Sequence, residues 1–417
     1  MSLVQINETA TEPLRRHRAL TGIIEQLMRR CELSPEAQER VRRHYKEKTE
    51  QLQGCPWLQQ FDLQLGPQGS VALGTSVAPI ARKHGEHDID LVLRVQAPKD
   101  LFDPRTLHRR IGERLRADYA DVLSPIRFGW TLDYAIKERF HFDVVAAIPW
   151  LHDTGGPMAA AANKDTNAWQ PTNPGGYAQR FLALAAILPV IADQEYQDLL
   201  EGRMVCNSRS VTVETLPEDT LLKFPLQRGT QFTKRFRDVW FSRRNRLKQR
   251  TPSIIVTTML WLAYERYVVG KTFSSMFAVL ETMAHHLDDP AFLRIREFQS
   301  GLRSYTLWNP TVPDENLVAR WNHPDRQGEA EEYFAWVKEF RAFLRSLAGA
   351  DGIHRLEPLL VESIGGVETP EVLREIAAAM RPSPTRAPVF HHHRVGLTTA
   401  AVAGATAVRA HTYDGKR

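Results

Sequence analysis

Cysteine is scarce in this sequence. The chain of 417 residues holds three cysteines, Cys31, Cys55 and Cys206, which lie far apart. Their odd number does not suit a disulfide framework, and no two of them have the short spacing of a zinc-binding motif. We therefore expect a protein of the reducing cytoplasm that contains no zinc.

Long hydrophobic runs are also missing. The longest apolar stretch, residues 254–264, contains two threonines and is shorter than the roughly 20 residues that span a bilayer. Residues 1–30 mix charges throughout, which is unlike a secretion signal. The sequence predicts a protein without a membrane segment.

Charge of either sign is plentiful, with a small excess of positive charge. The chain has 54 Lys and Arg against 49 Asp and Glu, a net charge of +5, which suits polyanionic partners such as nucleotides or nucleic acid. A typical domain has about 100–200 residues. The length of this chain therefore predicts two lobes.

The most informative stretch runs from residue 68 to residue 95. It begins with a turn that presents Gly69 and Ser70, and it ends in a predicted strand that carries Asp88 and Asp90. Because strand side chains alternate between faces, both carboxylates share one face. Two carboxylates on one face are hard oxygen ligands for Mg²⁺ or Mn²⁺, with nucleotide phosphates completing the shell. The other face is apolar and consists of Ile89, Leu91, Leu93 and Val95.

A third carboxylate, Asp143, lies inside the apolar run of residues 140–148. An Asp within a buried strand is costly unless it is paired or bound to metal. Asp133, on the preceding predicted strand, is the alternative, but its flanks are less apolar. Three carboxylates beside a Gly-Ser turn predict a catalytic site with two metal ions that transfers a nucleotidyl or phosphoryl group.

The order of these motifs resembles the polymerase-beta-like nucleotidyltransferase superfamily. More narrowly, the sequence resembles the bacterial CD-NTases (cGAS/DncV-like nucleotidyltransferases), relatives of animal cyclic GMP-AMP synthase that act as oligonucleotide cyclases in CBASS anti-phage defence. The resemblance covers roughly residues 34–345. Besides the motifs above, it rests on residues 173–177, 225–228, 234–238, 253–258 and 309–321.

This resemblance implies an α+β, two-lobed nucleotidyltransferase fold, in which a mixed twisted sheet carries Asp88, Asp90 and Asp143 and a helical lobe closes the nucleotide cleft. The implied activity makes a cyclic di- or trinucleotide second messenger from nucleoside triphosphates, ATP among them, and releases pyrophosphate. Its implied partners are CBASS accessory proteins and an effector that reads the product. The expected parts are N-terminal helices packing on the catalytic lobe (1–60), the catalytic core (61–176), the helical lobe (177–381) and a flexible basic tail (382–417).

Five residues are predicted to contact the nucleotide: Gln68, Gly69, Ser70, Lys234 and Ser253. Glycine lets the backbone approach phosphate, and serine adds a hydroxyl and an N–H group. The resemblance supports Lys234, although a basic helix face is more often simply solvated. Ser253 stands at a predicted helix N-terminus, which suits phosphate, but it is nearly as well explained as part of a helix cap.

The helix that begins near Ser253 is expected to have Thr251 as its N-cap. Ser34 is the expected N-cap of another helix, over residues 35–53. Residues 151–176 are rich in Gly, Pro, Asn and Ala and predict a loop that could form a substrate lid. Further helices are expected at residues 13–31, 104–119, 273–287, 290–302 and 329–347.

Two other functions are compatible with the same residues. A linear nucleotidyltransferase would extend RNA ends or modify a protein, and its product would be large. A non-catalytic RNA-binding relative would use the basic residues of 228–250, although such a protein has no need for three clustered carboxylates. The dense basic run at residues 243–250 could also bind a regulatory polyanion.

Overall fold

The computed structural model of the protein describes residues 12–78, 80, 87–134, 140–151, 157–192, 196–198, 223–365, 369–379, 390–392, 396–398 and 406–407. Cys206 and most of the predicted tail, residues 382–417, lie outside these ranges. Within the tail the structure describes three short strands, β12 (Phe390–His392), β13 (Gly396–Thr398) and β14 (Thr406–Ala407).

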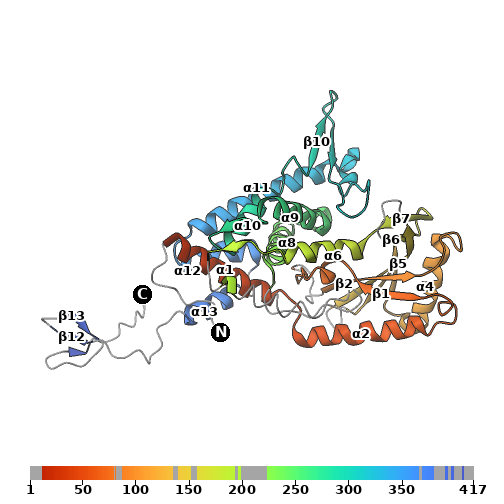
Figure 1. Ribbon diagram of the computed structural model, residues 1–417, viewed down its shortest axis with the longest axis horizontal. Coiled ribbons are helices and arrows are strands. Elements are labelled where there is room, and N and C mark those ends of the chain that lie inside the picture. Colours follow the sequence, from red (N-terminus) through yellow and green to blue (C-terminus); the bar gives the residue numbers. More distant parts are fainter. Residues whose placement is uncertain are drawn as a thin grey trace.

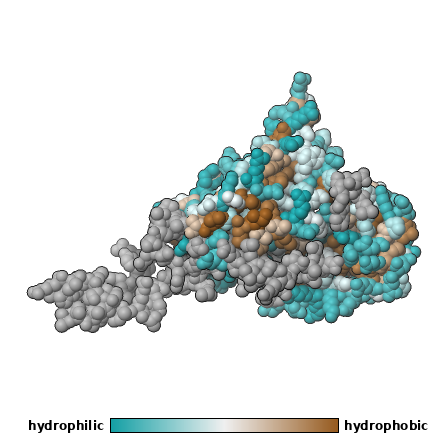
Figure 2. All heavy atoms as spheres, in the orientation of Figure 1, coloured by the Kyte–Doolittle hydropathy of each residue, from teal (hydrophilic) through white to brown (hydrophobic). Residues whose placement is uncertain are grey.

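Two lobes lie side by side, one built on a sheet and one on helices (Figure 1). Each lobe has its own buried apolar cluster, as expected for a chain of this length. The predicted α+β class with a mixed sheet and a helical lobe is confirmed. Hydrophilic residues cover most of the sheet lobe on the face drawn in Figure 2, and an apolar patch lies near the middle of that face.

The main sheet has the strand order β1-β2-β5-β4-β3, and β6 pairs with β5 and β7. β2 and β5 run parallel, whereas every other pair in this sheet is antiparallel. The sheet is therefore mixed, with its parallel pair at the centre. Its strands are β1 (Leu63–Pro67), β2 (His87–Val95), β3 (Leu123–Ile126), β4 (Gly129–Asp133), β5 (Phe140–Leu151), β6 (Pro157–Asn163) and β7 (Ala168–Thr172).

Two helices contribute to the apolar cluster on one face of the sheet, α2 (Pro35–Gln53) and α4 (Pro104–Tyr119). Both begin at a side-chain cap, which satisfies a backbone N–H that has no partner within the helix. The Ser34 hydroxyl accepts a hydrogen bond from the Ala37 amide at 3.2 Å, and Asp103 accepts one from the Thr106 amide at 3.0 Å. The predicted cap at Ser34 is confirmed.

The predicted loop and lid at residues 151–176 is wrong, because this segment contains two strands of the main sheet, β6 and β7. Alanine is depleted in strands, and four consecutive alanines, residues 159–162, hide the strand character of β6. Its conformation is set by pairing with the second half of β5, from Ala147↔Ala161 to Leu151↔Pro157. This pairing joins two consecutive strands, and the composition of the segment does not reveal it.

The predicted helix at residues 290–302 is also wrong. The chain forms a hairpin there, β10 (Arg294–Glu297) with β11 (Arg303–Thr306), which projects from the helical lobe (Figure 1). Gly301, in the connection between the strands, has φ +77°, a left-handed conformation that helps to reverse the chain.

The helical lobe is packed around α8 (Pro225–Arg243), whose residues 225–241 are all buried. Trp261, Trp321 and Trp336 are almost completely enclosed in the same core. α1 packs in this core, whereas α2 packs on the sheet. None of the helices in the described ranges is long and apolar enough to cross a membrane. The other main helices of the lobe are α1 (Glu12–Arg30), α6 (Pro174–Ala185), α9 (Ser253–Tyr267), α10 (Met276–His285), α11 (Gln327–Gly349), α12 (Ile353–Ile364) and α13 (Thr369–Ala379).

Candidate active site

The register of the central parallel strands sets the position of the three predicted catalytic carboxylates. Asp90 on β2 is the direct neighbour of Asp143 on β5, and Asp88 is the neighbour of His141. Directly paired residues of parallel strands point to the same face. Asp88, Asp90 and Asp143 therefore share the face opposite the apolar cluster beneath α2 and α4.

Neighbouring polar groups orient two of these carboxylates. The Thr131 hydroxyl donates to Asp143 Oδ1 at 2.5 Å, and His141 Nε2 lies 3.3 Å from Asp88 Oδ1. Asp133, the alternative third ligand, pairs with His141 on the far side of β5 from Asp88. The register thus places Asp143, and not Asp133, next to Asp90.

The carboxylates repel one another. Burial and the negative charges of Asp143 and Asp88 raise the pKa of Asp90 to about 7, against the opposing effect of the Lys234 ammonium. A divalent cation would reverse this balance, because an ion bound between the carboxylates favours their charged forms.

The donor set fits magnesium or manganese, which take carboxylate oxygens. Within the described ranges, no three or more His, Cys, Asp and Glu side chains form a ready-made metal cage. A complete cage is not needed, because Mg²⁺ is usually held by one or two carboxylates together with waters and substrate phosphates. The shared face of Asp88, Asp90 and Asp143 is where such ions would bind.

The predicted Gly-Ser turn is a one-turn helix, α3 (Gly69–Ala72), directly beside β2, the strand that carries Asp88 and Asp90. Gly69 has φ +58°, and a Cβ atom built there would lie 2.3 Å from Asp90 Oδ2. The backbone of this helix therefore approaches Asp90 so closely that only glycine fits. The Gln68 amide donates to the Asp90 carbonyl at 2.8 Å and fixes the start of α3 against β2.

Gln68 and Ser70 both have partners within the protein. Gln68 Nε2 donates to the Leu91 carbonyl at 3.2 Å, so that its side chain is bound to β2. Ser70 Oγ lies 3.1 Å from Ser76 Oγ, and the Ser70 carbonyl accepts from the Thr75 amide at 2.8 Å. The loop that follows α3 therefore supports Ser70.

One face of α8 holds this loop, residues 73–78. Four side chains donate to four carbonyl oxygens of the loop, and only Lys234 among them was predicted as a site residue. Their positions follow a helical repeat, i, i+4, i+7 and i+8, which is the signal that could have identified the others. The pairs are Gln227 with Leu73 (2.9 Å), Gln231 with Ser76 (3.0 Å), Lys234 with Thr75 (2.9 Å) and Arg235 with Ala78 (2.8 Å).

Lys234 brings a positive charge close to the carboxylates. It is buried, and this burial together with the nearby Arg237 lowers the pKa of its ammonium group to about 8, while Asp238 and Asp90 act in the opposite direction. The lysine is thus a buried cation between the loop and Asp90, and not part of a solvated helix face.

Ser253 is the first residue of α9, and its hydroxyl lies 3.2 Å from the donor Arg237 Nη1. Thr251 is not the N-cap that the sequence predicted. Its hydroxyl accepts from the Trp336 indole at 3.0 Å, and Pro252 precedes the helix. A nucleotide contact by Ser253 stays a prediction.

Most basic residues of the segment 228–250 are already engaged within the protein. Arg228, Lys234, Arg235 and Arg237 are buried. Three residues of the predicted polyanion-binding run form ion pairs, Arg243 with Glu362, Arg246 with Glu332 and Arg250 with Asp238. A basic surface of the kind that a non-catalytic RNA-binding protein needs is therefore not favoured at this segment.

Comparisons with known proteins find relatives that synthesise nucleotide second messengers. Residues 20–183 match the family of Second Messenger Oligonucleotide or Dinucleotide Synthetase (SMODS) domains. A c-di-GMP synthase from Roseivirga ehrenbergii is 26% identical over 311 residues, which cover 73% of each chain.

Solved structures show the same fold. The CD-NTase CdnG of Bradyrhizobium diazoefficiens, in complex with GTP, superposes with a TM-score of 0.60 at 17% identity, covering 86% of this chain and 98% of that one. CdnC of Escherichia coli, in a complex with a HORMA protein, has a TM-score of 0.54 at 14% identity, with 83% and 97% covered.

A mixed sheet that carries adjacent carboxylates beside a Gly-Ser helix defines a nucleotidyltransferase. Within that class, the SMODS match, which includes α3, β2 and β5, and the relative from Roseivirga ehrenbergii support an enzyme that synthesises cyclic oligonucleotides, and the fold is similar to that of the CD-NTases.

Proposed function

We propose that the protein makes a cyclic di- or trinucleotide from nucleoside triphosphates with divalent metal ions as cofactors. The observation that carries this proposal is the direct pairing of Asp90 with Asp143 at the point where Gly69 closely approaches Asp90. GTP is proposed as a substrate beside ATP, because the relative from Roseivirga ehrenbergii is named a c-di-GMP synthase and the CdnG structure contains GTP.

In the proposed reaction, a ribose hydroxyl of one nucleotide attacks the α-phosphate of another in line with the leaving pyrophosphate. Asp88, Asp90 and Asp143 would hold two Mg²⁺ or Mn²⁺ ions. When bound, these ions would activate the attacking hydroxyl and neutralise the charge of the phosphates. Ser70 and Lys234 bind the triphosphate of the donor nucleotide. A second attack in the same pocket closes the ring.

The proposed setting is CBASS antiviral defence in the cytoplasm. The complex of CdnC with a HORMA protein supports accessory proteins as partners for this chain as well. An effector that binds the cyclic product would complete the pathway.

The products themselves test the proposal. Purified protein is incubated with the four α-labelled ribonucleoside triphosphates and Mg²⁺ or Mn²⁺, and the products are treated with phosphatase and analysed by mass. We expect a small phosphatase-resistant product that disappears with EDTA and returns when excess metal is added. Small products that lose terminal phosphates to phosphatase would indicate a linear transferase, and labelled RNA or protein would indicate a macromolecular acceptor. Either result would contradict cyclisation.

Lys234→Met is expected to raise the KM for the nucleotide by about 10–100-fold, because it removes a desolvated cation from the triphosphate site. In the wild-type enzyme, the pKa of Lys234 near 8 means that the unliganded lysine loses its charge as pH rises through 8. Nucleotide affinity should therefore fall between pH 7 and pH 9 in the wild type. The same fall in Lys234→Met would assign this pH dependence to another group.

A further inference from the structure

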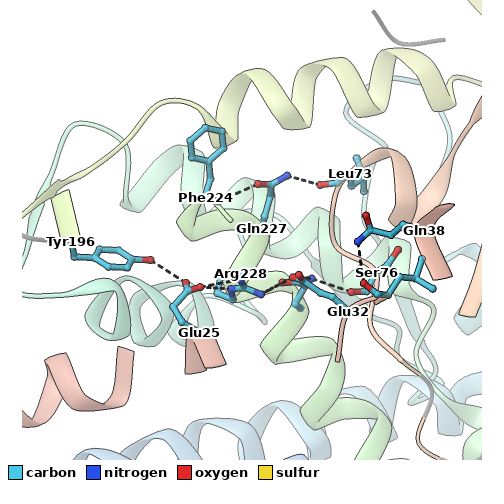
Figure 3. A network of polar contacts seen from close by, with 11 residues as sticks. Glu25, Glu32, Gln38, Leu73, Ser76, Tyr196, Phe224, Gln227 and Arg228 are labelled. Atoms are coloured by element: carbon cyan, nitrogen blue, oxygen red, sulfur yellow. Dashed lines mark hydrogen bonds and ion pairs between the residues drawn. The ribbon is translucent and has the colours of Figure 1, made fainter. Parts of the chain in front are cut away.

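A buried charge network joins α1 to α8 (Figure 3). Arg228 is fully buried, and its guanidinium contacts Glu25 at 2.9 and 3.0 Å and Glu32 at 2.8 Å. Glu25, also fully buried, accepts a further hydrogen bond from the Tyr196 hydroxyl at 3.2 Å. Buried ion pairs add little net stability, because desolvation offsets the attraction between the charges. Fixing the relative positions of α1 and α8 is therefore a better explanation of this network.

Gln231 extends the network towards the active site. Its Oε1 accepts from Arg228 at 2.7 Å, and its Nε2 donates to Glu32 at 2.8 Å and to the Ser76 carbonyl at 3.0 Å. Every polar atom of this amide therefore has a partner, and the side chain is held in one orientation.

The last link leads from Ser76 to Ser70. Their hydroxyl groups lie 3.1 Å apart, and Ser70 belongs to α3, the helix that faces Asp90. An unbroken series of polar contacts thus runs from Glu25 and Glu32 through Arg228 and Gln231 to the serine proposed to bind phosphate. In Figure 3 the network runs from Tyr196 and Glu25 through Arg228 towards Ser76.

We propose that Gln231 is a positioning residue for nucleotide binding, held in place by the Glu25–Arg228–Glu32 network. By binding the Ser76 carbonyl, it keeps the Ser76 hydroxyl against Ser70 and so prepares the phosphate-binding helix before the nucleotide arrives. Preorganisation of this kind lowers the entropic cost of binding. The inference rests on the proposed function, in which Ser70 contacts the donor triphosphate.

Gln231→Met tests this role, because methionine has a similar volume and removes both donated hydrogen bonds without adding charge. We expect the KM for GTP and for ATP to rise about tenfold with kcat changed less than about threefold, since the loop binds the ground and transition states alike. Thr233→Val is the matched control. Thr233 is also buried on α8, but its hydroxyl donates to the Gly229 carbonyl of the same helix at 2.8 Å. The KM of the Thr233→Val enzyme should therefore stay unchanged.

Combining the substitution with Ser76→Ala shows whether Gln231 acts through Ser76. We expect the double variant to have the KM of the weaker-binding single variant, since both changes break one pathway. Multiplicative effects of the two changes, or an unchanged KM in a folded Gln231→Met protein, would overturn the inference. If Gln231→Met does not fold, Ser76→Ala tests the inference by itself, because Ser76 is only partly buried and its replacement disturbs no core packing. A raised KM in Ser76→Ala would then support the inference, and an unchanged KM would overturn it.

A third variant separates this inference from the proposed function. Ser70→Ala should weaken binding of a non-hydrolysable GTP analogue. If it does so while Gln231→Met and Ser76→Ala bind normally, only the positioning role fails. If Ser70→Ala also binds normally, the phosphate contact and the positioning role fail together, whereas the product analysis still tests nucleotidyl transfer independently.

Discussion

Asp90→Asn is expected to reduce cyclic product by at least about 10³-fold. Asp90 pairs directly with Asp143 and is two residues from Asp88 on β2, so that its replacement removes the proposed metal ligand that neighbours both of the others. Loss of several kcal/mol of metal-dependent stabilisation of the transition state corresponds to a rate loss of this size. The rate is measured by pyrophosphate release at saturating nucleotide and Mg²⁺.

The same substitution should stabilise the metal-free protein above neutral pH. Asp90 has a pKa of about 7 in the folded protein and an ordinary value near 3.8 in the unfolded chain. The folded state therefore binds this proton more tightly, and the resulting stability is fully present below about pH 4 and is lost as pH rises through 7. In EDTA, the melting temperature of Asp90→Asn should exceed that of the wild type at pH 8 and match it near pH 4.

Asp133→Asn is the matched control for this prediction. Asp133 lies on the same face of the sheet but pairs with His141 and not with Asp143. Its replacement should change the rate by less than about threefold. An active Asp90→Asn enzyme, or an equal loss in Asp133→Asn, would contradict the assignment of the catalytic carboxylates.

The placement of Asp88 and Asp90 on one face of β2 was predictable, because it depends only on neighbouring residues in the sequence. Alternation in residues 87–95 alone determines which side chains of β2 share a face, and the cap at Ser34 depends on residues three positions apart. The site residues supplied by β2 and α3 therefore follow from short stretches of sequence.

The role of α8 was not predictable in this way. Its Arg, Lys and Gln residues have the composition of a solvated face, and the structure buries most of them, several with partners far away in the sequence. Gln231 binds the Ser76 carbonyl 155 positions earlier, and Arg228 binds Glu25 203 positions earlier. β6 was missed for a different reason, since its pairing with the preceding strand β5 overrides the weak strand propensity of alanine.

Gly69→Ala is expected to reduce activity by at least about 100-fold, because it moves Asp90. The new methyl group would lie 2.3 Å from Asp90 Oδ2, a distance that forces either the carboxylate or α3 to shift. A displacement of about 1 Å at a catalytic group can cost about 10²-fold in rate. The left-handed φ of +58° adds a backbone cost of about 1–2 kcal/mol to the loss of stability.

Gly270→Ala separates these two effects. Gly270 has a similar φ of +71°, but an added Cβ there meets no atom within 4 Å. This variant should therefore lose about 1–2 kcal/mol of stability and keep the wild-type rate. An equal loss of activity in both variants would mean that backbone strain alone causes the effect. A fully active Gly69→Ala enzyme would show that the activity tolerates a displacement of Asp90. Loss confined to Gly69→Ala would mean that this glycine is required because α3 directly contacts Asp90, the proposed metal ligand.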